Sequence, residues 1–143
     1  MAEIRTIEEL EKEARTLVDR LSPQSDSATL VTLSGDLGAG KTAFTKALAK
    51  ALGIEESVTS PTFVLEKIYA LPEGKAFQRL IHIDAYRLGS SAELPALGFD
   101  ELMNDSANLV VLEWPESVAD ALAPHLAIRI EADEQVVRTL SYG

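Results

Sequence analysis

The sequence contains no cysteine, so neither disulfides nor thiolate metal clusters can stabilise the fold. A buried core must do so alone, and 46% hydrophobic residues in a chain of 143 are enough for one. Long apolar runs are also missing, and the first residues lead into an acid-rich segment, so neither an export signal nor a membrane span is expected. We therefore predict a cytoplasmic protein with one domain over residues 1–143.

Basic residues are scarce, because 13 Lys and Arg stand against 23 Asp and Glu, a formal net charge of −10. Affinity for nucleic acids rests largely on neutralisation of phosphates by Lys and Arg. Autonomous DNA binding is therefore not expected, and any RNA would be held by another protein. A nucleotide remains compatible with this charge, because backbone N–H groups and one lysine can capture phosphates locally.

Apolar periodicity predicts alternating helices and strands. Helices are expected over residues 6–21, with Thr6 and Glu9 as a capping box, over 41–52 with Gly53 at the end, from a Ser91 cap to residue 97, and over 116–123. Strands are expected over residues 28–33, 63–70, 77–83, 109–112, 126–131 and 136–141. The second and third strands suit a hairpin-like connection, the run 109–112 suits a central strand, and the last two suit an antiparallel pair near the sheet edge.

A glycine-rich segment follows strand 28–33 and fits the pattern G-x-x-x-x-G-K-[ST]. In this phosphate-binding loop (P-loop), successive backbone N–H groups form a concave anion site, and the glycines permit the required backbone angles. The lysine reaches the β- and γ-phosphates, the next hydroxyl serves Mg²⁺, and the following helix adds its dipole. The sequence therefore predicts a site for ATP with Mg²⁺, formed by Gly35, Asp36, Leu37, Gly38, Ala39, Gly40, Lys41, Thr42 and Ala43.

A P-loop site also needs a carboxylate opposite the loop, usually at the end of a neighbouring buried strand. Glu113 follows four apolar residues in a row, and Asp84 follows residues 80–83. Glu113 has the cleaner pattern, although either acid could simply end its strand or cap the next turn. Which of the two touches the metal stays open at this point.

Four further residues near these motifs each allow two interpretations. Arg87 could stabilise charge on a transferring phosphate, but a structural or partner-facing ion pair is favoured. Trp114, the only tryptophan, either stacks on a mobile group or fills the core. Thr62 could sense the γ-phosphate or could simply follow a proline turn. His82 lies in an apolar strand, which favours a core histidine over a catalytic base.

Four segments together resemble the TsaE (YjeE) family in order and spacing. They are the loop 35–42, Ser60-Pro61-Thr62-Phe63, His82-Ile83-Asp84-Ala85-Tyr86-Arg87-Leu88 and Glu113-Trp114-Pro115. The likeness covers about residues 4–141, and only the P-loop among these motifs is generic. The family comprises small bacterial ATPases needed for N6-threonylcarbamoyladenosine (t6A) at position 37 of tRNAs. The resemblance implies an α/β fold like that of P-loop NTPases, with three α/β/α layers, a mostly parallel central sheet and antiparallel C-terminal strands.

The resemblance also implies roles for individual residues. Lys41 would bind phosphates, Thr42 and Glu113 would serve Mg²⁺, and Asp84 and Trp114 would be needed for ATP hydrolysis. Thr62 would belong to a switch-like loop, and Thr6 and Arg138 are the candidates for contacts near the adenine. The family usually has two threonines after the lysine; here Ala43 replaces the second, and the metal-binding hydroxyl is kept.

In this family, threonylcarbamoyl transfer belongs to TsaD working with TsaB, and the ATPase joins them as an ATP-dependent reset factor. The resemblance therefore implies TsaD-like and TsaB-like partners, tRNA contacted only through their complex, and slow hydrolysis in isolation. A small P-loop kinase is an alternative, although the seven arginines form no cluster for a lid. A nucleotide-dependent interaction switch with incidental hydrolysis is the other alternative.

Overall fold

The computed structural model describes residues 2–36, 40–55, 66–122, 125–132 and 138–142. Within these ranges, seven strands form one sheet in the order β1-β7-β6-β2-β5-β4-β3. The strands are β1 (Ala2–Ile4), β2 (Thr29–Ser34), β3 (Glu66–Ala70), β4 (Arg79–Asp84), β5 (Asn108–Glu113), β6 (Leu126–Ala132) and β7 (Arg138–Tyr142). The helices are α1 (Ile7–Arg20), α2 (Lys41–Ala51), α3 (Phe99–Met103) and the 3₁₀-helices η1 (Ser91–Leu97) and η2 (Pro115–Ala121).

The centre of the sheet is parallel and its margins are antiparallel. Strands β6, β2, β5 and β4 run in the same direction, whereas β3 is antiparallel to β4, β7 to β6 and β1 to β7. Every residue of β5 is buried, as expected for a continuous apolar run in a central strand covered on both faces. The predicted mostly parallel sheet, the β3–β4 hairpin and the antiparallel C-terminal pair are confirmed. Residues 63–65 and 136–137 of the predicted strands lie outside the described residues.

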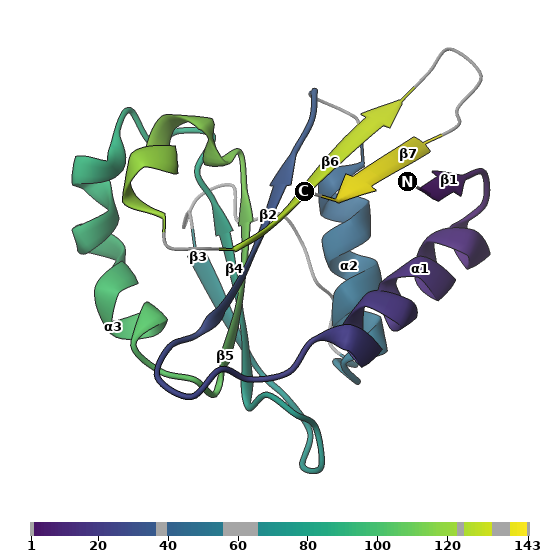
Figure 1. Cartoon of the computed structure of the whole chain (residues 1–143), viewed down its shortest axis with the longest axis horizontal. Helices are drawn as coiled ribbons and strands as arrows, with labels where there is room; N and C mark the ends of the chain where they lie inside the picture. The colour runs from purple at the N-terminus through teal and green to yellow at the C-terminus, as the bar shows by residue number, and fades with distance from the viewer. Residues whose placement is uncertain (1, 37–39, 56–65, 123–124, 133–137, 143) are drawn as a thin grey trace.

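Helices cover both faces of this sheet (Figure 1). Successive strand residues point to opposite faces, so Val31 and Val111 pack with α1 and α2, whereas Leu30 and Val110 pack with η1, α3 and η2. The two buried clusters thus form the two interfaces of an α/β/α sandwich, which confirms the predicted three layers. No helix in the described ranges is long and apolar enough to span a membrane.

The structure differs from the prediction in local details. Ser90, and not Ser91, caps η1: its backbone is extended and its hydroxyl accepts from the N–H of Ala92 at 3.3 Å. Ser91 lies inside the first turn, and its hydroxyl donates to Asp120 at 2.9 Å. The short elements β1 and α3 were not predicted, because segments of three and five residues are too short to show a period.

Candidate functional site

The carboxyl ends of three parallel strands bring the predicted site together. Leu33 of β2 is level with Glu113 of β5, and Glu113 is level with Asp84 of β4. The P-loop leaves β2 just beyond this level. Because parallel strands present their carboxyl ends at one edge, both acids lie at the edge from which the loop emerges, which is where α/β folds bind ligands.

The described part of the P-loop has the backbone angles that glycine permits. Gly35 has φ 145° and Gly40 has φ 106°, values that residues with a Cβ rarely adopt. Gly40 is also the N-cap of α2, so the helix begins at Lys41 and directs its amino terminus toward the loop. Asp36 and Ala43 are exposed. The other predicted loop residues, Leu37, Gly38 and Ala39, lie outside the described residues.

Lys41 is buried at the centre of this arrangement. Its Nζ donates to the carbonyl oxygens of Gly35 at 2.6 Å and Asp36 at 2.9 Å, and lies 3.8 Å from the centroid of the Trp114 ring. Burial lowers the pKa of Lys41, and the negative charge of Glu113 opposes that effect most strongly among the neighbouring acids. The ammonium is thus held within the loop by carbonyls and an aromatic face, a geometry of the cation–π type.

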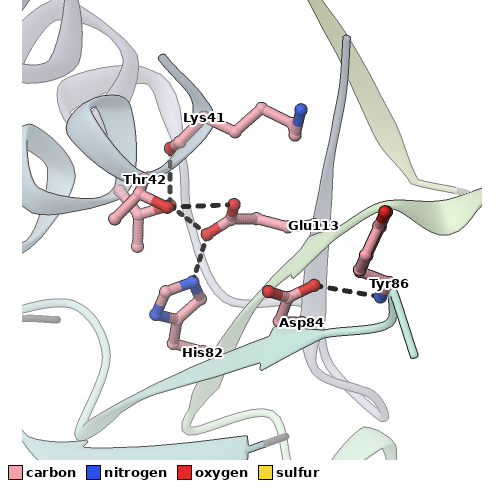
Figure 2. A network of polar contacts seen from close by, with 7 residues as sticks. Lys41, Thr42, His82, Asp84, Tyr86 and Glu113 are labelled. Atoms are coloured by element: carbon pink, nitrogen blue, oxygen red, sulfur yellow. Dashed lines mark hydrogen bonds and ion pairs between the residues drawn. The ribbon is translucent and has the colours of Figure 1, made fainter. Parts of the chain in front are cut away.

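Glu113 is the meeting point of the polar side chains (Figure 2). Glu113 is only 2% exposed. The Thr42 hydroxyl lies 3.3 Å from Oε1, while Oε2 contacts His82 Nε2 and lies 3.5 Å from the Thr45 hydroxyl. Asp84 lies on the neighbouring strand, and its Oδ1 accepts from the N–H of Tyr86 at 2.9 Å. The structure therefore places Thr42 directly against Glu113.

The structure adds two residues, His82 and Thr45, to the site that the sequence predicts. His82 is buried as predicted, with no exposed surface, but its ring reaches Glu113 and so belongs to the site. Thr45 was not singled out. It follows Thr42 by three residues on α2, which places both hydroxyls on one helical face, and this spacing is the signal that could have identified it.

Trp114 follows Glu113 in an unusual conformation. It is the one residue other than glycine with positive φ (59°) among the described residues, and its N–H donates to the Leu33 carbonyl at 3.1 Å. Its ring contacts Tyr86 at a centroid distance of 4.9 Å, and Tyr86 is 58% exposed. Since the ring also meets Lys41, the predicted stacking role is closer to the structure than the core-filling role.

The candidates for adenine contacts lie farther along the sheet. Ala132 at the carboxyl end of β6 is paired with Arg138, which is paired with Ile4. Arg138 and the start of α1 therefore lie at the same edge of the sheet as the P-loop. The Thr6 hydroxyl is the N-cap of α1 and accepts from the N–H of Glu9 at 3.1 Å. Thr62 lies outside the described residues. The structure therefore groups Thr6 with Arg138, but not with the residues around Glu113.

A parallel sheet that runs into a G-x-x-x-x-G-K-T loop, with a helix beginning at the lysine, defines a P-loop NTPase-like fold. Within that class the chain belongs to the TsaE family. The family model, described as "Threonylcarbamoyl adenosine biosynthesis protein TsaE", matches residues 5–140.

Similar proteins agree with this assignment. The tRNA threonylcarbamoyladenosine biosynthesis protein TsaE of Mycobacterium bovis is 39% identical over 138 residues, which cover 90% of this chain and 80% of the relative. The protein of the same name from Streptomyces coelicolor is 41% identical over 120 residues, covering 82% and 78%. The crystal structure of Bacillus subtilis YdiB is similar with a TM-score of 0.74 and 29% identity, covering 99% of this chain and 82% of that one.

Proposed function

We propose that this TsaE-family protein acts in tRNA threonylcarbamoyladenosine biosynthesis by binding and hydrolysing ATP with Mg²⁺. The observation that carries the proposal is the convergence of Lys41, Thr42 and Glu113 where β2 and β5 end. Membership of the family and the names of the relatives support the pathway.

The phosphates would bind in the loop before α2. Lys41 Nζ already donates to two carbonyl oxygens of the loop, and the charged oxygens of a triphosphate would form stronger, charge-assisted bonds with the same ammonium. The amino terminus of α2 adds free N–H groups and a favourable dipole. The proposed role of Gly35, Gly40 and the loop between them is to let the backbone approach the phosphates closely.

Mg²⁺ fits the side chains that face each other across this edge. Thr42 Oγ1 and Glu113 Oε1 are 3.3 Å apart, and a hydroxyl and a carboxylate are the hard oxygen ligands that Mg²⁺ prefers. No group of three or more His, Cys, Asp or Glu that could hold a metal occurs among the described residues, so phosphates and water would complete the shell. The ion, when bound, would neutralise charge that develops on the phosphates.

Asp84 and Trp114 are the proposed partners for the hydrolysis step. Asp84 lies one strand from Glu113 at the same level, where a carboxylate can orient water for attack on the γ-phosphate. Trp114 packs its ring on Lys41, so it restricts where the ammonium can lie and keeps water from that side. We do not assign Arg87 a catalytic role.

Replacement of Lys41 by alanine tests the nucleotide site directly. Lys41→Ala should weaken ATP binding at least roughly tenfold, because charge-assisted hydrogen bonds to the phosphates are lost. The matched control is Lys46→Ala, which removes an exposed lysine from the same helix and should leave affinity unchanged. The measurement is isothermal titration calorimetry with Mg²⁺. Equal affinity in the wild type and in both variants would contradict the proposal.

TsaD and TsaB are the proposed partners, and tRNA would be contacted through their complex. The net charge of −10 makes this chain unsuited to holding a polyanion by itself. Hydrolysis would be slow in isolation if the partners supply part of the catalytic site, as happens in other P-loop NTPases.

A nucleotide-dependent switch is a second candidate, favoured by one observation. Trp114 contacts both the buried Lys41 and the exposed Tyr86. A movement of the Lys41 ammonium would therefore be transmitted through the Trp114 ring to the molecular surface at Tyr86. In this scheme, ATP binding would change the surface offered to a partner, and hydrolysis would be incidental.

A further inference from the structure

The buried carboxylate of Glu113 needs hydrogen-bond donors, because an unpaired charge inside a protein is strongly unfavourable. The side chains of Thr42, Thr45 and His82 contact its two oxygens. They divide between its two oxygens: Oε1 faces Thr42, while Oε2 faces His82 and Thr45. Oε1 is on the side of the proposed metal, so the orientation of the carboxylate depends on the donor that binds Oε2.

Thr45 is the weaker of the two donors to Oε2. Its hydroxyl has a single proton and lies 3.1 Å from the Lys41 carbonyl oxygen but 3.5 Å from Oε2. The shorter contact is a normal hydrogen bond within the helix, and the longer one is at the outer limit for such bonds. The proton of Thr45 therefore goes to the Lys41 carbonyl, and His82 remains as the donor to Oε2.

The environment of His82 determines which ring nitrogen carries a proton. A carboxylate only accepts hydrogen bonds, so Nε2 must carry hydrogen in order to face Oε2. Nδ1 is buried and has no partner in the part of the chain that the structure describes. An acceptor without a partner is tolerated more readily than a buried N–H without one. The tautomer with hydrogen on Nε2 alone is therefore favoured, because it pairs Nε2 with Oε2 and leaves Nδ1 as an acceptor.

We propose that His82 is a positioning residue, which holds Glu113 Oε2 through Nε2–H and thereby presents Oε1 toward Thr42 and Mg²⁺. The inference rests on the proposed function, because it concerns the carboxylate of the ATP site. His82 is well placed for this role, since its ring is fully buried on the central strand β4, next to β5. Partners of metal ligands commonly fix ligand orientation in this way.

The first test separates the effect on the metal from the effect on the fold. Affinity for the slowly hydrolysed analogue adenosine 5′-(β,γ-imido)triphosphate is measured by calorimetry over a Mg²⁺ series and in EDTA. His82→Leu keeps the volume but removes the donor, and should reduce the Mg²⁺-dependent gain in affinity about 10-fold to 100-fold. Affinity in EDTA should stay unchanged. His82→Gln, whose amide can place a donor near the position of Nε2, should restore most of the gain.

The other outcomes of this test would contradict the positioning role of His82 alone or the proposed function as well. If His82→Leu keeps the full Mg²⁺-dependent gain, or loses affinity equally in Mg²⁺ and EDTA, the positioning role is overturned while the proposed function stands. If the wild type shows no Mg²⁺-dependent binding, the proposed function fails and the inference fails with it.

The second test reads the hydrogen bond itself. The chain has two histidines, so the ring nitrogens in a ¹⁵N–¹H spectrum are assigned by comparison with His125→Gln, a change at an exposed position. The proposal requires the tautomer with hydrogen on Nε2 at His82, and a Glu113→Gln variant should shift that resonance. Hydrogen on Nδ1 alone would overturn the proposal even if every variant folds.

Discussion

At the scale of single residues, Lys41 combines burial with a proposed role, phosphate binding, that needs its charge. Burial lowers its pKa, so in the free protein the ammonium loses its proton at a lower pH than an ordinary lysine does. Phosphates would favour the charged form and raise the pKa in the complex. Binding therefore takes up a proton once the pH exceeds the pKa of the free protein.

This linkage predicts an alkaline loss of nucleotide affinity. ATP affinity should be constant near neutral pH and should fall as the pH rises through the lowered pKa of Lys41. Calorimetric titration from about pH 7 to about pH 10 measures it. Lys41→Arg keeps its charge throughout this range and provides the control, so a fall of the same size in that variant would assign the effect to another group.

Residue identities could be predicted where a motif fixes them, but their contacts could not. Apolar runs predict that Asp84 and Glu113 each lie at the end of a strand, and the register of β4 and β5 places the two acids level with each other. The link from His82 to Glu113 is different, because it joins residues 31 positions apart and depends on which face of β4 the ring occupies. An apolar flank indicates burial for a histidine, but not its hydrogen-bond partner.

At the scale of elements, the start of α1 shows how a predicted motif can be partly realised. Thr6 accepts from the N–H of Glu9 as a capping box requires, but the Glu9 carboxylate accepts from the N–H of Arg5 and not from that of Thr6. The amino terminus of the helix is thus capped, and the returning bond fixes the turn after β1 instead. The same threonine is also the candidate for a contact near the adenine.

Substitution of Thr6 can separate these two roles. Thr6→Ala should lower the free energy of unfolding by about 1 kcal/mol, because the cap is lost, whereas Thr6→Ser should retain it. Chemical denaturation measures this difference. ATP affinity in the same variants tests the adenine contact: a loss in Thr6→Ala that exceeds the error of calorimetry supports it, and unchanged affinity would leave Thr6 with capping alone.

Among the helices, the long ones were predictable from their apolar period, and the short α3 was not. The helices α1 and α2 span 14 and 11 residues, so their apolar faces repeat often enough to show a helical period. Gly98, in the left-handed conformation, divides residues 91–103 into a 3₁₀-helix, which contains Pro95, and a short α-helix. Its buried residues Leu94 and Phe99 are fixed by packing on the sheet, and packing does not appear in local sequence patterns.

At the scale of the whole molecule, the net charge of −10 and the proposed site at the carboxyl edge of the parallel strands call for a test with partners. Hydrolysis of ATP should rise when the organism's TsaB and TsaD are added to the wild-type protein, because the partners would complete the site. Phosphate release with and without them measures this rise. An unchanged rate in the presence of both proteins would contradict the proposed partnership.

Glu113→Gln, added to the same reconstitution, distinguishes hydrolysis from switching. The variant replaces the proposed metal-binding carboxylate with a neutral amide of nearly the same shape, so hydrolysis should stop even if complex formation survives. Multiple turnover of tRNA modification should then be lost if hydrolysis resets the complex. Retained turnover would favour the interaction switch.

The contact between Lys41 and Trp114 also makes Trp114 an intrinsic fluorescence probe of the site. The emission of an indole depends on charge near its ring, and here a cation lies 3.8 Å from the centroid. Because the chain has one tryptophan, its indole fluorescence comes from this position alone. Movement of Lys41, the proposed phosphate-binding residue, can therefore be followed in real time, in the unlabelled protein and also within an assembly whose partners lack tryptophan.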